Sequence, residues 1–196
     1  MPYIDLVTDD AAAGEATVLL DSIRASGGDI PNFVRLFAHR PQVYRAWRGL
    51  VEVIMENTDL RRYELATIAA ARQLGSSYCM LAHGKVLLDR FCDAEALQRI
   101  ARDHRSAGLD EVDVAVMDLA EKVAGDASSI THEDVDRLLR LGLSEADVLD
   151  VVLAAAARCF FSKTLDALGV QADVAYRTLD PDLRQALVVG RQIAES

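Results

Sequence analysis

The apolar positions of this chain recur with the period of an α-helix along nearly its whole length. Strand signals are scarce, because the sequence has neither an Asn-Gly nor an Asp-Gly hairpin turn and no long alternation of polar and apolar residues. We therefore predict an all-α fold.

Capping residues, prolines and glycines divide the chain into helices. Asp9 or Asp10 is expected to begin the first helix, and Thr58 and Ser76 are expected to cap the two helices on either side of Gly75. The predicted helices are 11–26, 32–39, 41–57, 59–74, 77–91, 94–104, 109–126, 132–142, 145–169 and 182–195. In the helix 41–57, one apolar face is expected to hold Val43, Trp47, Leu50 and Ile54.

Residues 144–162 repeat the pattern of residues 58–76, with a capping residue, an Ala-Arg run and a serine in the same register. This pattern predicts a duplicated helical hairpin, and the alternative is two ordinary alanine-rich core helices. The second copy has Leu165 and Gly169 at the positions of Cys79 and His83. We therefore expect one domain over residues 1–196, with a motif-bearing half at 41–105 and a degenerate half at 109–175 that serves as scaffold.

Composition and charge exclude several classes of function. The 196 residues include 31 acidic and 21 basic side chains, for a net charge of −10. This balance argues against binding to nucleic acid or to an anionic membrane surface. No apolar run is long enough to span a bilayer, and the first residues do not resemble a secretory signal. Three widely spaced cysteines do not predict a disulfide framework, so we expect a cytoplasmic protein.

The candidate chemistry lies between Glu64 and His83. Cys79 and His83 are four residues apart, so on one helix they share a face. If Ser76 is the N-cap, Cys79 lies in the first turn, where free N–H groups and the helix dipole favour a thiolate. Glu64 lies on the preceding helix and reaches the pair only if the helices cross suitably. In that case it would orient the imidazole, hold it cationic and complete a proton relay.

Other readings of these residues remain open. Cysteine is often an inert core residue, and Glu64, Cys79 and His83 are all possible metal ligands. No fourth ligand is apparent nearby, and we predict no metal site. Trp47 and Tyr78 are candidates for the wall of a substrate pocket, although aromatic residues more often pack in the core.

The spacing Glu64-x11-Ser76-x2-Cys79-x3-His83 resembles the signature Glu-x11-Cys-x2-Cys-x3-His of the AhpD-like alkylhydroperoxidases and the carboxymuconolactone decarboxylase family. The resemblance covers roughly residues 30–180 and extends to the peroxidase-related branch with a degenerate second half. It implies an AhpD-like helical bundle that assembles as a trimer or hexamer. It also implies a peroxidase-type thiol oxidoreductase that reduces organic hydroperoxides without a bound cofactor.

Ser76 stands where the family has the first cysteine of its pair, and serine cannot form a disulfide. The resemblance then implies a single-cysteine scheme in which Cys79 becomes a sulfenic acid, His83 and Glu64 move protons, and an external thiol or dithiol is the electron donor. Ser76 is a possible hydrogen-bond donor to the thiolate. We expect Cys92 to be too far along the helix to resolve Cys79, and Cys159 to be a core residue.

Two other functions are compatible with the same residues. The decarboxylase branch acts on a lactone acid without any thiol cycle, and the missing cysteine at position 76 favours it. The remaining possibility is a non-catalytic helical oligomer in which the motif is a relic.

Overall fold

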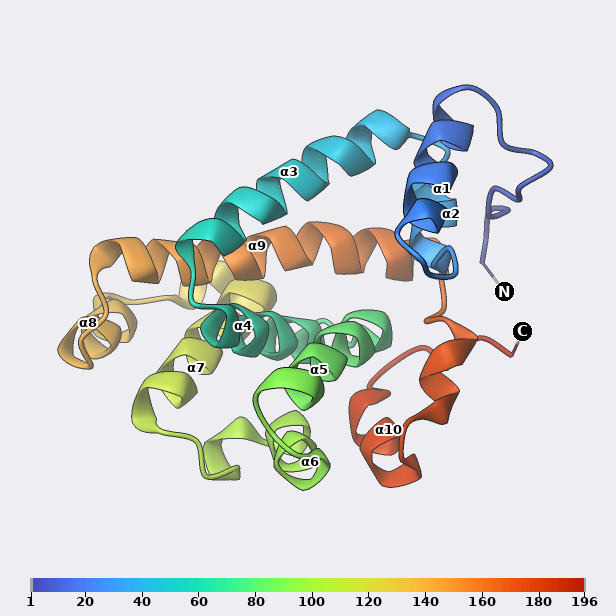
Figure 1. Cartoon of the computed structure of the whole chain (residues 1–196). Coiled ribbons are helices and arrows are strands. Elements are labelled where there is room, and N and C mark those ends of the chain that lie inside the picture. The colour runs from blue at the N-terminus through green and yellow to red at the C-terminus, as the bar shows by residue number, and fades with distance from the viewer. Residues whose placement is uncertain (1, 196) are drawn as a thin grey trace.

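The computed structural model describes residues 2–195, which form ten α-helices and three short 3₁₀ helices and contain no strand (Figure 1). The predicted all-α class is confirmed. The α-helices are α1 (Glu15–Ala25), α2 (Asn32–Phe37), α3 (Pro41–Asn57), α4 (Leu60–Gln73), α5 (Ser77–Arg90), α6 (Ala94–Arg102), α7 (Glu111–Asp126), α8 (His132–Arg140), α9 (Glu145–Ala167) and α10 (Pro181–Leu187).

Helix α4 is the centre of the molecule. It packs against α5, α7 and α9, and its residues from Tyr63 to Ala71 are all buried. The alanines among them let neighbouring helices approach closely, because the distance between helix axes depends on the side chains at the contact. Helix α9 packs against α4 and α7, and α3 slants above α9 in the view of Figure 1. Within the described residues, no helix is both long and apolar enough to cross a membrane.

Two local predictions are corrected at the start of α4 and along α3. Asp59, and not Thr58, caps α4 by accepting a hydrogen bond from the backbone N–H of Arg62 at 2.9 Å. Thr58 instead donates to the carbonyl of Ile54 on the preceding helix. The buried face of α3 includes Trp47 and Ile54 as predicted, but Tyr44 and Val51 complete it, and Val43 and Leu50 are exposed.

The predicted helix 11–26 begins only at Glu15, because Gly14 in the left-handed region (φ 58°) holds the N-cap position. The predicted helix 182–195 ends at Leu187, after which the chain leaves helical geometry and runs across the turn between α4 and α5.

The register between residues 58–76 and 144–162 does not produce a second hairpin. Helix α9 continues without a break past Phe161 and Ser162, which stand at the positions of Gly75 and Ser76 in the first copy. Gly75 adopts a φ of 67°, which an aromatic residue rarely adopts, so only the first copy can turn there.

The C-terminal segment is held against the α4–α5 turn by a close backbone contact. The N–H of Gly190 donates to Ser77 Oγ at 2.8 Å, and an added Cβ at Gly190 would lie 2.0 Å from the carbonyl oxygen of Gly75. Only glycine allows this approach.

We therefore expect Gly190→Ala to lower the free energy of unfolding by about 1–3 kcal/mol, because the C-terminal segment must move away from the turn. Urea denaturation followed by circular dichroism measures the change. The matched control is Gly49→Ala on α3, where an added Cβ meets nothing within 4 Å. An unchanged midpoint for Gly190→Ala would contradict the contact.

Candidate active site

The turn between α4 and α5 places the motif. Gly75 turns the chain, Ser76 occupies the N-cap position of α5, and Cys79 lies in the first turn as predicted. Ser76 is fully buried, but its hydroxyl makes no capping hydrogen bond to α5.

Glu64 on α4 reaches His83 on α5. Its Oε2 lies 2.6 Å from the imidazole Nδ1, and the carboxyl group is buried. Since a carboxylate accepts a hydrogen bond from Nδ1–H, Nε2 is the nitrogen of the neutral ring that is free to accept a proton. The two helices therefore cross in the way that the Glu–His part of the relay requires.

The charge of His83 differs from the expectation. Burial lowers the pKa of its imidazole from the ordinary value of 6.5, the Arg158 cation lowers it further, and the hydrogen bond to Glu64 offsets these effects only in part. The prediction that Glu64 holds the ring cationic is wrong. A neutral imidazole at pH 7 is suited to accept a proton.

The thiol of Cys79 is only 1% exposed, yet it has two polar neighbours. Ser162 donates to its Sγ at 3.1 Å, and the guanidinium of Arg158 lies 3.6 Å from it. Both residues come from α9, one helical turn apart. Within the described chain, neither Ser76 nor His83 makes a hydrogen bond to this sulfur atom, so Ser162 takes the donor role that was expected of Ser76.

Arg158 is 2% exposed and forms no ion pair with a carboxylate within 4.0 Å in the part of the chain that the structure describes. Besides Cys79, its guanidinium contacts the hydroxyl of Tyr63 at 3.4 Å. Burial opposes the charge, but Cys79 and Tyr63 outweigh that effect and the net pKa shift of Arg158 is upward. A buried cation needs a compensating negative charge, and a thiolate at Cys79 would supply one.

A cavity of about 220 Å³ opens beside these groups. Its lining is largely apolar and contains Cys79, His83, Glu64 and Arg158. The aromatic part of the wall is formed by Phe33, Trp47, Tyr63, Tyr78 and Phe161. Trp47 stacks on Phe161 with 4.3 Å between ring centroids, and the hydroxyl of Tyr78 donates to Asp173. The structure thus places Tyr78 and Trp47 in the lining of this cavity.

All three cysteines are free, and neither of the other two lines the cavity beside Cys79. Cys92 lies beyond the end of α5 and points its thiol toward the carbonyl of Leu87. Cys159 follows Arg158 on α9 and is half-buried. Burial raises the pKa of both thiols, which keeps them protonated and less reactive.

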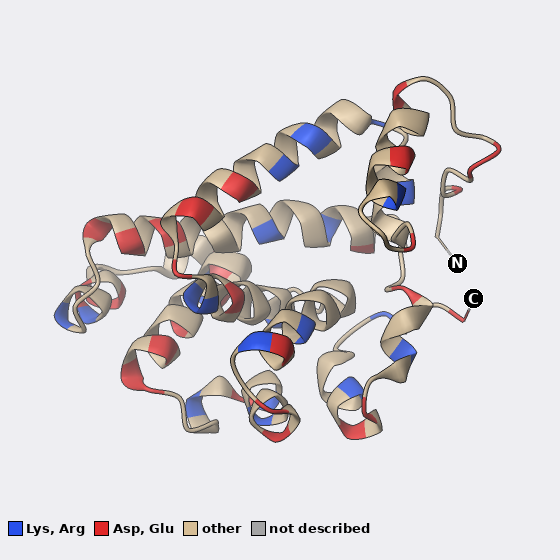
Figure 2. Cartoon of the chain, viewed as in Figure 1, with Lys and Arg blue, Asp and Glu red and all other residues tan. Residues whose placement is uncertain are grey.

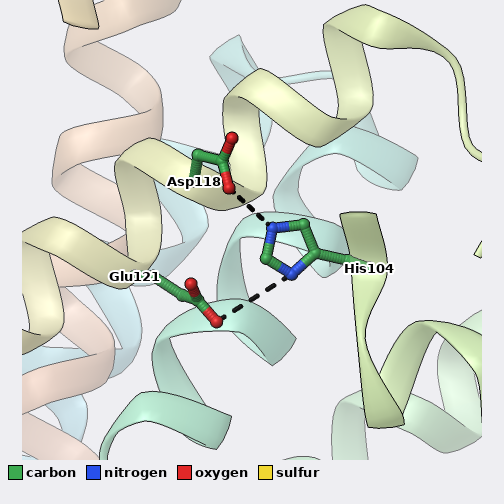
Figure 3. A group of neighbouring side chains, drawn as sticks. All are labelled: His104, Asp118 and Glu121. Atoms are coloured by element: carbon green, nitrogen blue, oxygen red, sulfur yellow. Dashed lines mark hydrogen bonds and ion pairs between the residues drawn. The ribbon is translucent and has the colours of Figure 1, made fainter. Parts of the chain in front are cut away.

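A second cluster, His104, Asp118 and Glu121, brings possible metal ligands within 4.8 Å of one another (Figure 3). His104 Nε2 lies 2.9 Å from Asp118 Oδ1, and this histidine is buried in a polar network. The two carboxylates are already paired with three guanidinium groups, those of Arg72, Arg105 and Arg137. We interpret the cluster as a structural ion network. Among the described residues, the ligand atoms of Glu64, Cys79 and His83 do not all lie within 4.8 Å of one another.

Sequence reasoning missed Arg158 and Ser162 and assigned the second half to scaffold. That assignment is corrected, because α9 supplies both groups that contact the sulfur atom. The sequence feature that could have identified them is the four-residue spacing of an arginine and a serine on the otherwise apolar core face of an alanine-rich helix.

Comparison with known proteins agrees with the motif. Residues 41–122 match the model of the carboxymuconolactone decarboxylase family, and this segment contains Glu64, Cys79 and His83. The resemblance drawn from the motif is thereby confirmed. No curated protein matches the chain significantly.

Three solved structures share the fold. A peroxidase-related protein with an AhpD core from Ralstonia eutropha JMP134 aligns with a TM-score of 0.78 at 18% identity, covering 97% of this chain and 98% of that one. A peroxidase-related protein from Silicibacter sp. TM1040 aligns with a TM-score of 0.78 at 19% identity, covering 90% and 94%. A cysteine-to-alanine variant of the debrominase Bmp8 in complex with 2,3,4-tribromopyrrole aligns with a TM-score of 0.76 at 15% identity, covering 95% and 100%. At these identities the comparisons show the AhpD-like fold.

The coupling between Arg158 and His83 predicts a titration result. We expect the His83 ring to titrate below pH 6.5, because burial and Arg158 both disfavour its charged form. Arg158→Met removes the cation and should raise the midpoint. NMR of the imidazole C–H resonances, assigned with His83→Gln, measures both values. A midpoint that does not move in Arg158→Met would show that the two groups are not coupled.

Proposed function

We propose that the protein is a thiol peroxidase that reduces organic hydroperoxides through Cys79. The observation that carries the proposal is the setting of the Cys79 sulfur. It lies in the lining of an apolar cavity, beside an arginine and a serine that can stabilise a thiolate, and the same cavity holds a histidine oriented by a buried carboxylate.

The reaction begins with transfer of the thiol proton to Nε2 of His83. The thiolate attacks the terminal oxygen of the hydroperoxide, so that an S–O bond forms and the O–O bond breaks. Cys79 is oxidised to a sulfenic acid, and the alkoxide that leaves takes the proton from His83 to become an alcohol. Arg158 and Ser162 stabilise the negative charge on sulfur before the attack, and Glu64 keeps the imidazole in the tautomer that accepts the proton.

Regeneration requires thiols from outside the chain. Ser76 cannot form a disulfide, and neither Cys92 nor Cys159 lines the cavity that Cys79 faces. One external thiol condenses with the sulfenic acid to give a mixed disulfide and water. A second thiol releases Cys79 and leaves as a disulfide with the first. We place this chemistry in the cytoplasm, where small thiols are kept reduced.

A second candidate is a lyase that acts on a lactone acid, as in the decarboxylase branch. The observation in its favour is Arg158, because a buried guanidinium in the cavity wall is a suitable partner for a substrate carboxylate. This reaction has no use for the Cys79 sulfur, so a cysteine variant separates the two candidates.

We expect cumene hydroperoxide to convert Cys79 to a sulfenic acid in a fast, stoichiometric reaction. Trapping with dimedone and mass spectrometry of the peptides locates the modification. Cys79→Ser should lose it completely, whereas the matched variants Cys92→Ser and Cys159→Ser should keep it. Reaction no faster than that of a free thiol would reject the peroxidase. Lactone turnover that survives Cys79→Ser would establish the lyase. If the protein shows neither activity, the remaining candidate is a non-catalytic oligomer.

The role of Arg158 predicts a graded result. Arg158→Met should slow oxidation of Cys79 by about ten- to a hundredfold, the loss expected for one hydrogen bond to a charged group. Arg158→Lys keeps the charge and should be affected less, and Ser162→Ala should fall between the wild type and Arg158→Met. Stopped-flow rates with cumene hydroperoxide at pH 7 measure the series. A wild-type rate in Arg158→Met, with an unchanged circular dichroism spectrum, would exclude this role.

A further inference from the structure

The hydroxyl of Tyr63 is a buried polar group in the wall of the cavity beside Cys79. Tyr63 directly precedes Glu64 on α4, its side chain is 1% exposed, and it lines the same cavity as Cys79 and His83. Its ring lies edge-on to the imidazole of His83, with 6.2 Å between the ring centroids. The side chain therefore belongs to the site, although the reaction proposed for Cys79 gives it no role.

The contact with Arg158 fixes the direction of this hydroxyl. Nη2 of Arg158 lies 3.4 Å from the Tyr63 hydroxyl, and Nη1 of the same guanidinium lies 3.6 Å from the Cys79 sulfur. A guanidinium only donates hydrogen bonds, so the hydroxyl oxygen accepts and its own hydrogen points elsewhere. Within residues 2–195, the hydroxyl makes no other hydrogen bond. Its hydrogen is thus a donor without a protein acceptor in the buried wall.

The charge of Arg158 strengthens this donor. The acidic residues of α9 lie in its first turns and near its end, and Arg158 lies between them (Figure 2). The residues one turn away from it along the helix are uncharged, namely Ala154, Ala155, Phe161 and Ser162. The guanidinium therefore polarises the hydroxyl that it contacts, and a hydroxyl that accepts from a cation donates a stronger hydrogen bond.

The other tyrosine in the cavity wall is arranged differently. The hydroxyl of Tyr78 donates to Asp173, so its hydrogen is already bound within the chain. An oxygen atom of a molecule in the cavity is the acceptor that the position of Tyr63 allows.

We propose that Tyr63 is a further catalytic residue, whose hydroxyl donates a hydrogen bond to the leaving oxygen of the hydroperoxide. This inference rests on the peroxidase proposal. When the Cys79 thiolate bonds to the terminal oxygen, the electron pair of the O–O bond passes to the oxygen that carries the alkyl group. The hydrogen bond from Tyr63 stabilises this charge, and the proton held by His83 then completes the alcohol, so that Tyr63 keeps its own proton. Tyr63 acts on the leaving group, whereas Arg158 and Ser162 act on the sulfur.

The test compares three reagents that react with the same sulfur and release leaving groups of different basicity. Cumene hydroperoxide releases an alkoxide, perbenzoic acid releases benzoate, and iodoacetamide releases iodide. Only the alkoxide is basic enough to depend on the hydrogen bond. We expect Tyr63→Phe to slow oxidation by cumene hydroperoxide by about a hundredfold, the loss typical of one oxyanion donor, and to change the rates with the other two reagents little. Stopped-flow and quench measurements give the rates, and mass spectrometry confirms Cys79 as the site of reaction.

Three further variants serve as controls. Tyr44→Phe should keep all three rates, because Tyr44 is also buried, at 7% exposed, but does not line the cavity. Arg158→Met should slow all three reactions, because it acts on the thiolate before any leaving group departs. Replacement of Tyr63 by 3-fluorotyrosine retains the hydroxyl and the shape of the ring, so it should keep most of the rate with cumene hydroperoxide that Tyr63→Phe loses.

Equal losses with all three reagents in Tyr63→Phe would show that the hydroxyl only holds Arg158 in place, and would overturn its role at the leaving oxygen. A wild-type rate with cumene hydroperoxide in Tyr63→Phe would overturn it too, as would a 3-fluorotyrosine variant as slow as Tyr63→Phe. In each of these cases the peroxidase proposal stands. That proposal fails, and the role of Tyr63 with it, if the wild-type protein reacts with cumene hydroperoxide no faster than a free thiol does.

Discussion

The buried guanidinium of Arg158 is the constraint on which the rest of the site depends. An arginine inside a helical core is costly unless its charge and its hydrogen-bonding groups are compensated. No carboxylate within the described chain forms an ion pair with it, and its polar contacts are the Cys79 sulfur and the Tyr63 hydroxyl. The contact between the Arg158 guanidinium on α9 and the Cys79 sulfur atom on α5 thus connects the second half of the chain to the first. A negative charge on that sulfur atom would balance the charge of the guanidinium.

This constraint also sets the roles of the other polar groups. Arg158 and burial together keep His83 neutral, which makes the imidazole a proton acceptor, and Glu64 decides which of its nitrogens is free. In the reaction that we propose, groups on α9 stabilise the negative charge on sulfur, in addition to the position of Cys79 in the first turn of α5. The function that we propose therefore requires both halves of the chain, although one half carries all the residues of the recognisable motif.

The predictions that hold are those that depend only on residues close together in the sequence. Most helix boundaries follow from caps, prolines and glycines, because these act within a few residues of one another. The prediction for the C-terminal segment fails, because a contact between Gly190 and Gly75 decides where α10 ends. The buried face of α3 is likewise selected by packing. Several stripes of that helix are apolar, and α9 and the aromatic cluster around Phe161 decide which of them is covered.

By itself, the sequence determined the helical class, the turn at Gly75, the place of Cys79 in the first turn of a helix, and the four-residue spacing that puts His83 on its face. These properties depend on neighbours along the chain. The tertiary structure decided that Glu64 reaches His83, that the imidazole is neutral, and that Arg158 and Ser162 contact the sulfur atom. Those properties depend on how α9 crosses α4 and α5, and the crossing is set by the packing of many side chains that no local pattern specifies.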